Sequence, residues 1–377
     1  MDLRGLRELR LRVQGLRSPY DASAPEVVRR FVAVQAQEFL PAQWGLAARV
    51  PSERRPDAAS VAAALDAGEI LRTHVLRPTW HFLHPADARW VMELSAERVH
   101  RANGTYYRRT GLEGATATRA MDVVAASVAG GHRTRAELAD ALVAGGVSNA
   151  GLSFAYVMIM AELERIAISG ANVGKQRTYA AFDERVPPSP PRPRDEALAE
   201  LAARYLAARG PARDRDFAAW SGFTLSDTRR AFADAADLAG DGRIEWIDVE
   251  GTPHALDAAS VASADERTDG VIGERGVIDL VQAYDEYIMG YAAPRAYLLP
   301  PGLDAVHAEF PLHALMVDGV MVGRWAPVVQ DRRATARIVP WRDLTPGEER
   351  SLAASVAALE RFLGLPVTLE VEPIVAP

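Results

Sequence analysis

The chain has 377 residues, a net charge of −7 and no cysteine. The lack of cysteine excludes disulfides, thiolate zinc sites and cysteine nucleophiles, and the length predicts two to four domains of about 100 to 200 residues each. A charged N-terminal stretch and the lack of any apolar run of about 18 residues predict a soluble cytoplasmic protein that does not enter a membrane.

Positive charge is concentrated near the N-terminus. Residues 1–110 contain 17 arginines and 12 acidic residues, so they carry +5 and the rest of the chain carries −12. Lys175 is the only lysine. A general preference for arginine over lysine explains why the chain has so few lysines, but it does not explain why positive charge is concentrated in residues 1–110. Arginine is also the better residue for forked phosphate contacts, so these arginines are candidates for holding a nucleic-acid backbone.

The first segment, residues 1–112, reads as three helices followed by a hairpin. Residues 3–16 have an amphipathic helical pattern, and a second helix begins near Pro25 and is expected to carry Gln35 and Gln37 before Pro41 ends it. Residues 57–67 predict a third helix, and residues 69–85 are β-rich and interrupted by Arg-Pro. Three helices and then a hairpin is the order of a winged helix.

The same order recurs twice, in residues 113–186 and 187–255. A capping box at Thr134 opens one of the helices of the second segment, and the proline-rich residues 187–193 predict a stiff linker. From residue 256 to residue 377 strands dominate, with a hairpin at Asp318-Gly319 and one closing helix. The predicted fold class is therefore α+β: three tandem winged-helix units followed by a small C-terminal β-barrel.

Gln35 and Gln37 are the first candidate site. On a regular helix, side chains two residues apart point about 200° apart, so the pair converges only if the helix unwinds near Gln37. An amide has no usable protonation equilibrium near neutrality, but it can hold a water molecule or a base edge in a fixed orientation. The alternative is that both glutamines decorate a solvated helix face.

The first hairpin is a candidate recognition element. Its polar side chains are suited to phosphate contacts, and Trp80 either stacks or packs in a core. The candidate DNA-binding residues, including two from the second hairpin, are Arg72, His74, Arg77, Thr79, Trp80, His81, Lys175 and Arg177. A metal site at His74, His81 and His84 is rejected, because strand alternation places His81 and His84 on opposite faces. Residues 284–287 contain carboxylates for which we expect a structural salt-bridge role.

Four segments carry a resemblance to a known family. They are Ala33-Val34-Gln35-Ala36-Gln37, residues 72–82, residues 178–187 and Tyr284-Asp285-Glu286-Tyr287. In this order they resemble the winged-helix DNA-binding-domain-containing family, whose characterised branch is the AlkZ and YcaQ type of DNA glycosylase. The resemblance implies a DNA channel and excision of bulky alkylated or crosslinked bases. Gln-x-Gln marks the AlkZ-like branch, which Gln35 and Gln37 match, whereas Gln-x-Asp marks the other.

Two function classes follow. In the first, the chain is a monofunctional DNA glycosylase in which Gln35 and Gln37 position water, without a cofactor or metal. An N7-alkylated purine is already cationic and leaves as a neutral base, so it needs no general acid. The partner is double-stranded DNA with alkylated or crosslinked bases, and the protein is expected to be a monomer. In the second, the chain is a non-catalytic winged-helix DNA-binding or regulatory protein.

Overall fold

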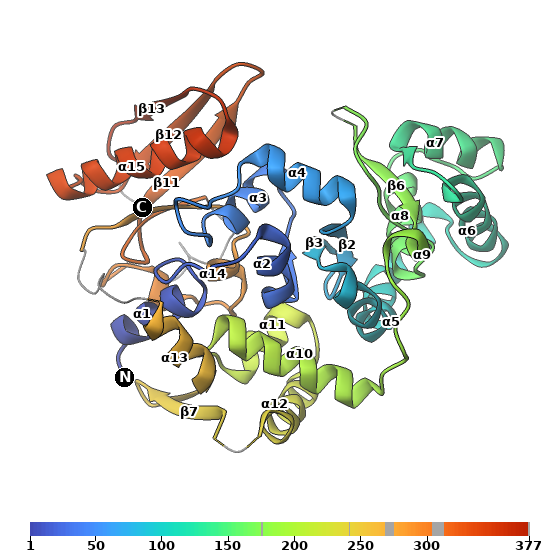
Figure 1. Ribbon diagram of the computed structural model, residues 1–377. Coiled ribbons are helices and arrows are strands. Elements are labelled where there is room, and N and C mark those ends of the chain that lie inside the picture. Colours follow the sequence, from blue (N-terminus) through green and yellow to red (C-terminus); the bar gives the residue numbers. More distant parts are fainter. Residues whose placement is uncertain (175, 241, 268–274, 304–312, 376–377) are drawn as a thin grey trace. The chain divides into compact units, whose positions relative to one another are not determined.

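A computed structural model describes residues 1–174, 176–240, 242–267, 275–303 and 313–375. The chain has a mixed α/β fold (Figure 1) that divides into two compact units. The larger unit comprises residues 1–31, 37–61 and 202–377, and the smaller unit comprises residues 32–36 and 62–201. None of the helices in the described part of the chain is both long and apolar enough to span a membrane.

The smaller unit contains two three-stranded sheets, with strand orders β1-β3-β2 and β4-β6-β5. The strands are β1 (Ala33–Gln35), β2 (Leu71–Val75), β3 (Thr79–Leu83), β4 (Arg133–Thr134), β5 (Ala167–Ser169) and β6 (Thr178–Ala181). The helices are α5 (Pro85–Thr110), α6 (Gly114–Val128), α7 (Arg135–Ala144), α8 (Ser153–Leu163) and α9 (Phe182–Arg185). Helices α6, α7 and α8 bury a common apolar core that includes Val124, Leu138 and Met158.

The larger unit contains a five-stranded sheet and a separate hairpin. Its helices are α1 (Leu3–Val13), α2 (Ala24–Phe31), α3 (Phe39–Ala47), α11 (Asp214–Ser221), α12 (Leu225–Ala239), α13 (Ala258–Glu266), α14 (Glu286–Met289) and α15 (Pro346–Leu363). Its strands are β7 (Ile244–Val249), β8 (Thr252–Asp257), β9 (Ile278–Val281), β10 (Ala314–Val317), β11 (Val320–Val329), β12 (Ala334–Pro340) and β13 (Val367–Val371). The division between the units falls within α4 (Ala58–Ala67) and α10 (Arg194–Arg209).

The C-terminal strands form an open sheet rather than the expected closed barrel. The strand order is β13-β12-β11-β10-β9, and β13 and β9 are its two edges in the part of the chain that the structure describes. Helix α15 contacts both edge strands and lies along one face of the sheet (Figure 1). When a helix covers a sheet, the apolar face of the sheet is buried without the strands closing into a barrel. The pattern of apolar residues in the strands does not distinguish these two arrangements.

The segment with the two glutamines is not helical, so that expectation was wrong. Helix α2 ends at Phe31, and Val32 has a φ of 64° that turns the chain into β1. A positive φ is rare for a β-branched residue, and no local pattern predicts it. Pro41 is the third residue of α3 instead of a helix stop, because the N–H groups of a first helical turn have no partner within the helix.

Several local signals are confirmed. The β2–β3 hairpin lies within residues 69–85, and Thr134 forms the expected capping box with Glu137 at the start of α7. The hairpin between β10 and β11 turns at Asp318 and Gly319, both with positive φ, as an Asp-Gly turn requires. Residues 187–193 contain no helix or strand and lie within the smaller unit, so the stiff linker predicted there stays a prediction.

Candidate functional site

The first glutamine of the motif is held in a sheet. Strand β1 pairs antiparallel with β3 so that Gln35 lies opposite His81. Ala36, the next residue, donates its backbone N–H to the carbonyl oxygen of Trp80 at 2.7 Å. The pairing therefore extends beyond β1 to the middle residue of the Gln-x-Gln motif.

Arg72 holds the other backbone group of Ala36. Its Nε and Nη2 donate hydrogen bonds of 3.1 and 2.9 Å to the Ala36 carbonyl oxygen. The guanidinium carbon lies 4.1 Å from the ring centroid of Trp80, and the Arg72 side chain is buried. Burial, followed by the nearby charge of Arg177, lowers the pKa of Arg72 to about 9. Because both its N–H and its carbonyl are bonded, Ala36 has a fixed peptide orientation.

Arg77 fixes the side chain of Gln35. Its Nη2 donates a hydrogen bond of 2.8 Å to the Gln35 Oε1 atom, and Gln35 is only 2% exposed. A guanidinium has donors but no acceptor, so the amide oxygen rather than the amide nitrogen must face Arg77. This contact sets the orientation of the whole carboxamide.

Gln37 is the solvent-accessible glutamine of the pair. It lies in the loop between β1 and α3 and is exposed, whereas Gln35 is buried. The division between the two compact units falls directly before Gln37. Glu38, the N-cap residue of α3, places its carboxylate 2.7 Å from Nε2 of His313. Of the two amides, the one of Gln37 is therefore better placed to reach an external water molecule or DNA.

Glu162 is a buried carboxylate that sequence reasoning missed. It is fully buried, and its Oε2 lies 3.0 Å from the backbone nitrogen and 2.6 Å from Nδ1 of His74. The His74 ring in turn lies 3.9 Å from the Trp80 ring, centroid to centroid. The available signal was a single acidic residue near the end of an otherwise apolar helix, α8. Glu162 joins α8 to the first hairpin.

The predicted DNA-binding residues differ in exposure. Arg72, His74 and His81 are buried, while Arg77, Thr79 and Trp80 are half-buried and Arg177 is exposed. Lys175 lies outside the described residues. The hairpin therefore has a buried set of polar residues that bond to the protein itself and a more accessible set near its turn.

The remaining histidines have local roles. His81 places its Nδ1 2.9 Å from the Thr79 carbonyl oxygen, and His84 accepts a hydrogen bond from the Ala86 backbone N–H at the start of α5. In the described ranges, three or more potential metal-ligating side chains do not gather anywhere.

The carboxylates of residues 284–287 have the structural role expected for them. Asp285 forms a two-pronged ion pair with Arg49, with N–O distances of 2.6 and 2.9 Å, and both side chains are buried. Glu286 accepts hydrogen bonds from Arg209 at 2.8 Å and from Trp220 at 3.1 Å. Removing one partner of such a pair would leave an uncompensated buried charge and destabilise the larger unit.

Comparisons with known proteins agree on one family. Residues 28–362 match the family described as DNA glycosylase AlkZ-like. An interstrand DNA cross-link repair glycosylase of Streptomyces sahachiroi is 27% identical over 347 residues, which cover 85% of this chain and 87% of that protein. The solved structure of the Streptomyces sahachiroi DNA glycosylase AlkZ superposes with a TM-score of 0.76 at 21% identity. That superposition covers 99% of this chain and 100% of that one, so the two share a fold. Because the family match spans most of its length, this chain belongs to the AlkZ-like family of DNA glycosylases.

Proposed function

We propose that this protein is a monofunctional DNA glycosylase that hydrolyses the N-glycosidic bond of alkylated or crosslinked purines. Family membership and the likeness to a cross-link repair glycosylase support the reaction class. One observation supports the choice of Gln37 as the residue that positions water. Gln37 is exposed and directly follows Ala36, whose backbone N–H and carbonyl oxygen are both hydrogen-bonded. A site that positions water needs such a rigid support.

The proposed chemistry requires orientation more than proton transfer. An N7-alkylated purine carries positive charge in the ground state and departs as a neutral base, so no general acid is needed. Gln37 orients the attacking water through its amide, and Gln35 supports the motif from its bonded position beside Arg77. Glutamine has the same water-orienting role in GTP hydrolysis by small GTPases.

We assign the hairpin residues two kinds of role. Arg77, Thr79, Trp80, Lys175 and Arg177 contact the DNA backbone, and Arg77 also orients Gln35 through its Nη2. Arg72, His74 and His81 hold the hairpin and the motif in place from buried positions. Backbone contacts by a few cations predict an affinity that falls steeply with salt and varies little with sequence, which a salt titration on two unrelated duplexes tests. A sharp preference for a palindromic sequence would instead favour a regulatory protein.

We further propose that the chain contains three winged-helix units, with boundaries at residues 1–112, 113–186 and 187–255, and acts as a monomer. The succession of α6, α7 and α8 before the β5–β6 hairpin supports the second unit, and α10, α11 and α12 before β7–β8 support the third. Limited proteolysis near residues 187–193 tests the linker, and light scattering tests the oligomeric state.

Base release is the direct test of the reaction. The purified protein is incubated with a duplex that contains one N7-methylguanine and, separately, with a duplex that contains an interstrand purine crosslink. The proposal predicts free purine, detected by mass spectrometry, and an abasic site in the same strand. Tight binding of both duplexes without release of any base would support the non-catalytic alternative.

A further inference from the structure

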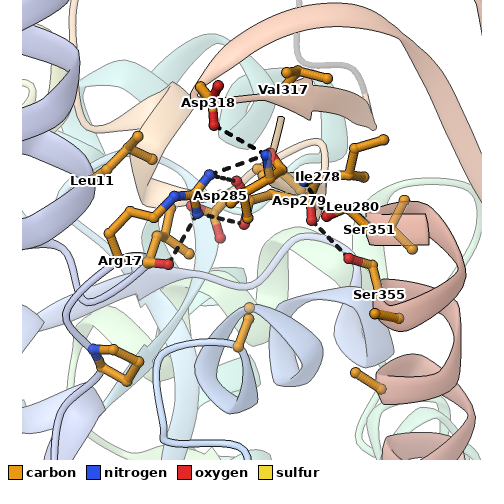
Figure 2. A pocket seen from close by; sticks show the side chains of 18 of the residues that line it. Leu11, Arg17, Ile278, Asp279, Leu280, Asp285, Val317, Asp318, Ser351 and Ser355 are labelled. Carbon is orange, nitrogen blue, oxygen red and sulfur yellow. Dashed lines mark hydrogen bonds and ion pairs between the residues drawn. The ribbon is translucent and has the colours of Figure 1, made fainter. Parts of the chain in front are cut away.

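The larger unit contains a cavity of about 1160 Å³ that the proposed reaction does not use. Its walls come from α1, α3 with the loop that follows it, β9 and α15. Figure 2 shows Arg17 and Asp279 in its centre, with Ser351 and Ser355 of α15 at one side. Ligand pockets commonly enclose about 300 to 1000 Å³, so this cavity has room for a nucleotide-sized molecule.

The acidic side chains that line the cavity already have partners. Asp279 binds Arg17 through two hydrogen bonds of 2.9 and 2.7 Å, and Asp285 binds Arg49. Asp318 accepts hydrogen bonds from the backbone N–H groups of Gly276 and Val277, and Glu8 pairs with Arg4. Each of these carboxylates therefore already has a hydrogen-bonded partner.

Arg55 and Arg361 have no such bonded carboxylate, although the charges of Asp279 and Glu53 partly offset the effect of burial and of Arg361 on the pKa of Arg55. Both line the cavity, and in the described part of the chain neither forms an ion pair with a carboxylate. Arg55 uses its Nε to bind the Ala47 carbonyl oxygen at 3.1 Å, a contact that leaves its two terminal nitrogens for other acceptors. Burial, followed by the charge of Arg361, lowers the pKa of Arg55. Two neighbouring cations repel each other, and an anion placed between them would reverse that repulsion.

Helix α15 leaves room in the cavity through its small side chains, and it also sets the position of Arg361. Its cavity-lining residues before Arg361 are small: Ala354 lies between Ser351 and Ser355 in the sequence, and Ala358 lies between Ser355 and Arg361. The helix is anchored on β9, because Ser351 accepts a hydrogen bond from the Ile278 N–H and Ser355 donates one to the Ile278 carbonyl. The backbone that carries Arg361 is thereby fixed beside the cavity.

The geometry points to a binding site for a phosphate-bearing ligand in this cavity, in which Arg55 and Arg361 grip one phosphate group. Planar guanidinium forks match the oxygen geometry of phosphate and are favoured at such sites. The phosphate belongs either to a free small molecule or to a DNA backbone. The assignment rests on the larger unit alone and does not depend on base release by the glutamine motif.

Isothermal titration of the full chain tests the site with two probes, pyrophosphate and an undamaged DNA duplex. Arg55→Gln and Arg361→Gln are compared with Arg350→Gln, which removes the same charge from an exposed position of α15 outside the cavity. We expect each cavity variant to weaken binding at least about tenfold, while Arg350→Gln stays within about twofold of wild type. Arg361 is exposed, so its variant is expected to fold even if Arg55→Gln does not.

The pattern of loss identifies the source of the phosphate. Loss of pyrophosphate binding alone indicates a free phosphate-bearing molecule, and loss that includes the duplex indicates a backbone phosphate. If Arg361→Gln binds both probes as wild type does, or loses no more affinity than Arg350→Gln, the proposed site is wrong.

Discussion

The Arg77 guanidinium donates a hydrogen bond of 2.8 Å to the side-chain oxygen of Gln35. Arg77 lies in the turn of the β2–β3 hairpin and thus orients an amide on a different strand, β1. That amide belongs to Gln35, which is almost fully buried. The first glutamine of the motif is a bonded element of the sheet rather than a free surface side chain. This burial is why we propose that Gln35 supports the site and that Gln37, which is exposed, reaches the water.

Replacing Arg77 with Met is predicted to slow base release on the order of tenfold. The change removes one charge-assisted hydrogen bond and lets the Gln35 amide rotate, and such a bond contributes about 1.5 to 3 kcal/mol. Single-turnover release from the N7-methylguanine duplex measures the effect. Arg77→Lys keeps a donor and should recover part of the rate. If Arg77→Met releases the base at the wild-type rate, Arg77 has no role in positioning the site.

Replacing Arg72 with Met is predicted to lower the free energy of unfolding by about 1 to 3 kcal/mol. Methionine fills much of the volume but leaves the Ala36 carbonyl without its two donors, and an unsatisfied buried acceptor is costly. Urea denaturation measures the loss. Arg177→Met, at an exposed position of the same unit, should stay within about 0.5 kcal/mol of wild type. Equal stability of both variants would contradict the clamping role of Arg72.

Much of the local structure can be predicted from the sequence, because the responsible signals are themselves local. Alternation with a central Arg-Pro predicts the β2–β3 hairpin, and Asp318-Gly319 predicts the β10–β11 turn from its φ requirement. The capping box at Thr134 predicts the start of α7. Each of these depends on a few adjacent residues whose preferences agree with the final fold.

The site itself depends on long-range contacts, which sequence patterns do not contain. Strand β1 is only three residues long and exists because it pairs with β3, far along the chain. All five residues of β2 are buried, so the strand has no alternation of buried and exposed positions. Its sequence therefore does not show whether Arg72 binds the Ala36 carbonyl or a phosphate. The positive φ of Val32 is imposed by tertiary structure against the residue's own preference.

Acid should remove a specific contribution to the stability of α15. The hydrogen bond from Arg342, opposed by burial and helped by the Thr345 N–H, holds the pKa of Glu348 below its ordinary value of 4.5. A lowered folded-state pKa means that the stabilising effect is complete above about pH 4.5 and disappears as the pH falls through the folded-state value. The difference in unfolding free energy between wild type and Glu348→Gln should therefore shrink as the pH falls below about 4.5.

The matched control for that experiment is Glu349→Gln, which changes the exposed neighbour on the same helix. It removes the same charge without removing the ion pair to Arg342. Urea denaturation at a series of pH values compares the two variants. A difference between wild type and Glu348→Gln that stays constant with pH would show that ionised Glu348 does not stabilise the fold.

The proposed enzyme should leave an intact abasic strand. Glycosylases that also cut DNA attack the sugar with an amine and form a Schiff base, and this chain contains one lysine, Lys175. Borohydride added during turnover should trap no covalent protein–DNA adduct, and strand breaks should appear only after alkali or heat. A trapped adduct that is absent from Lys175→Ala would overturn both the hydrolytic mechanism and the role given to the glutamines.

In the proposed reaction, Gln37 orients the water that releases the base. Single-turnover release from the N7-methylguanine duplex by Gln37→Ala, measured beside duplex affinity and thermal stability, tests it most directly. We predict a rate at least about 100-fold below wild type, with affinity within about twofold and stability within about 0.5 kcal/mol, because Gln37 is exposed. Base release by Gln37→Ala at the wild-type rate would contradict the account.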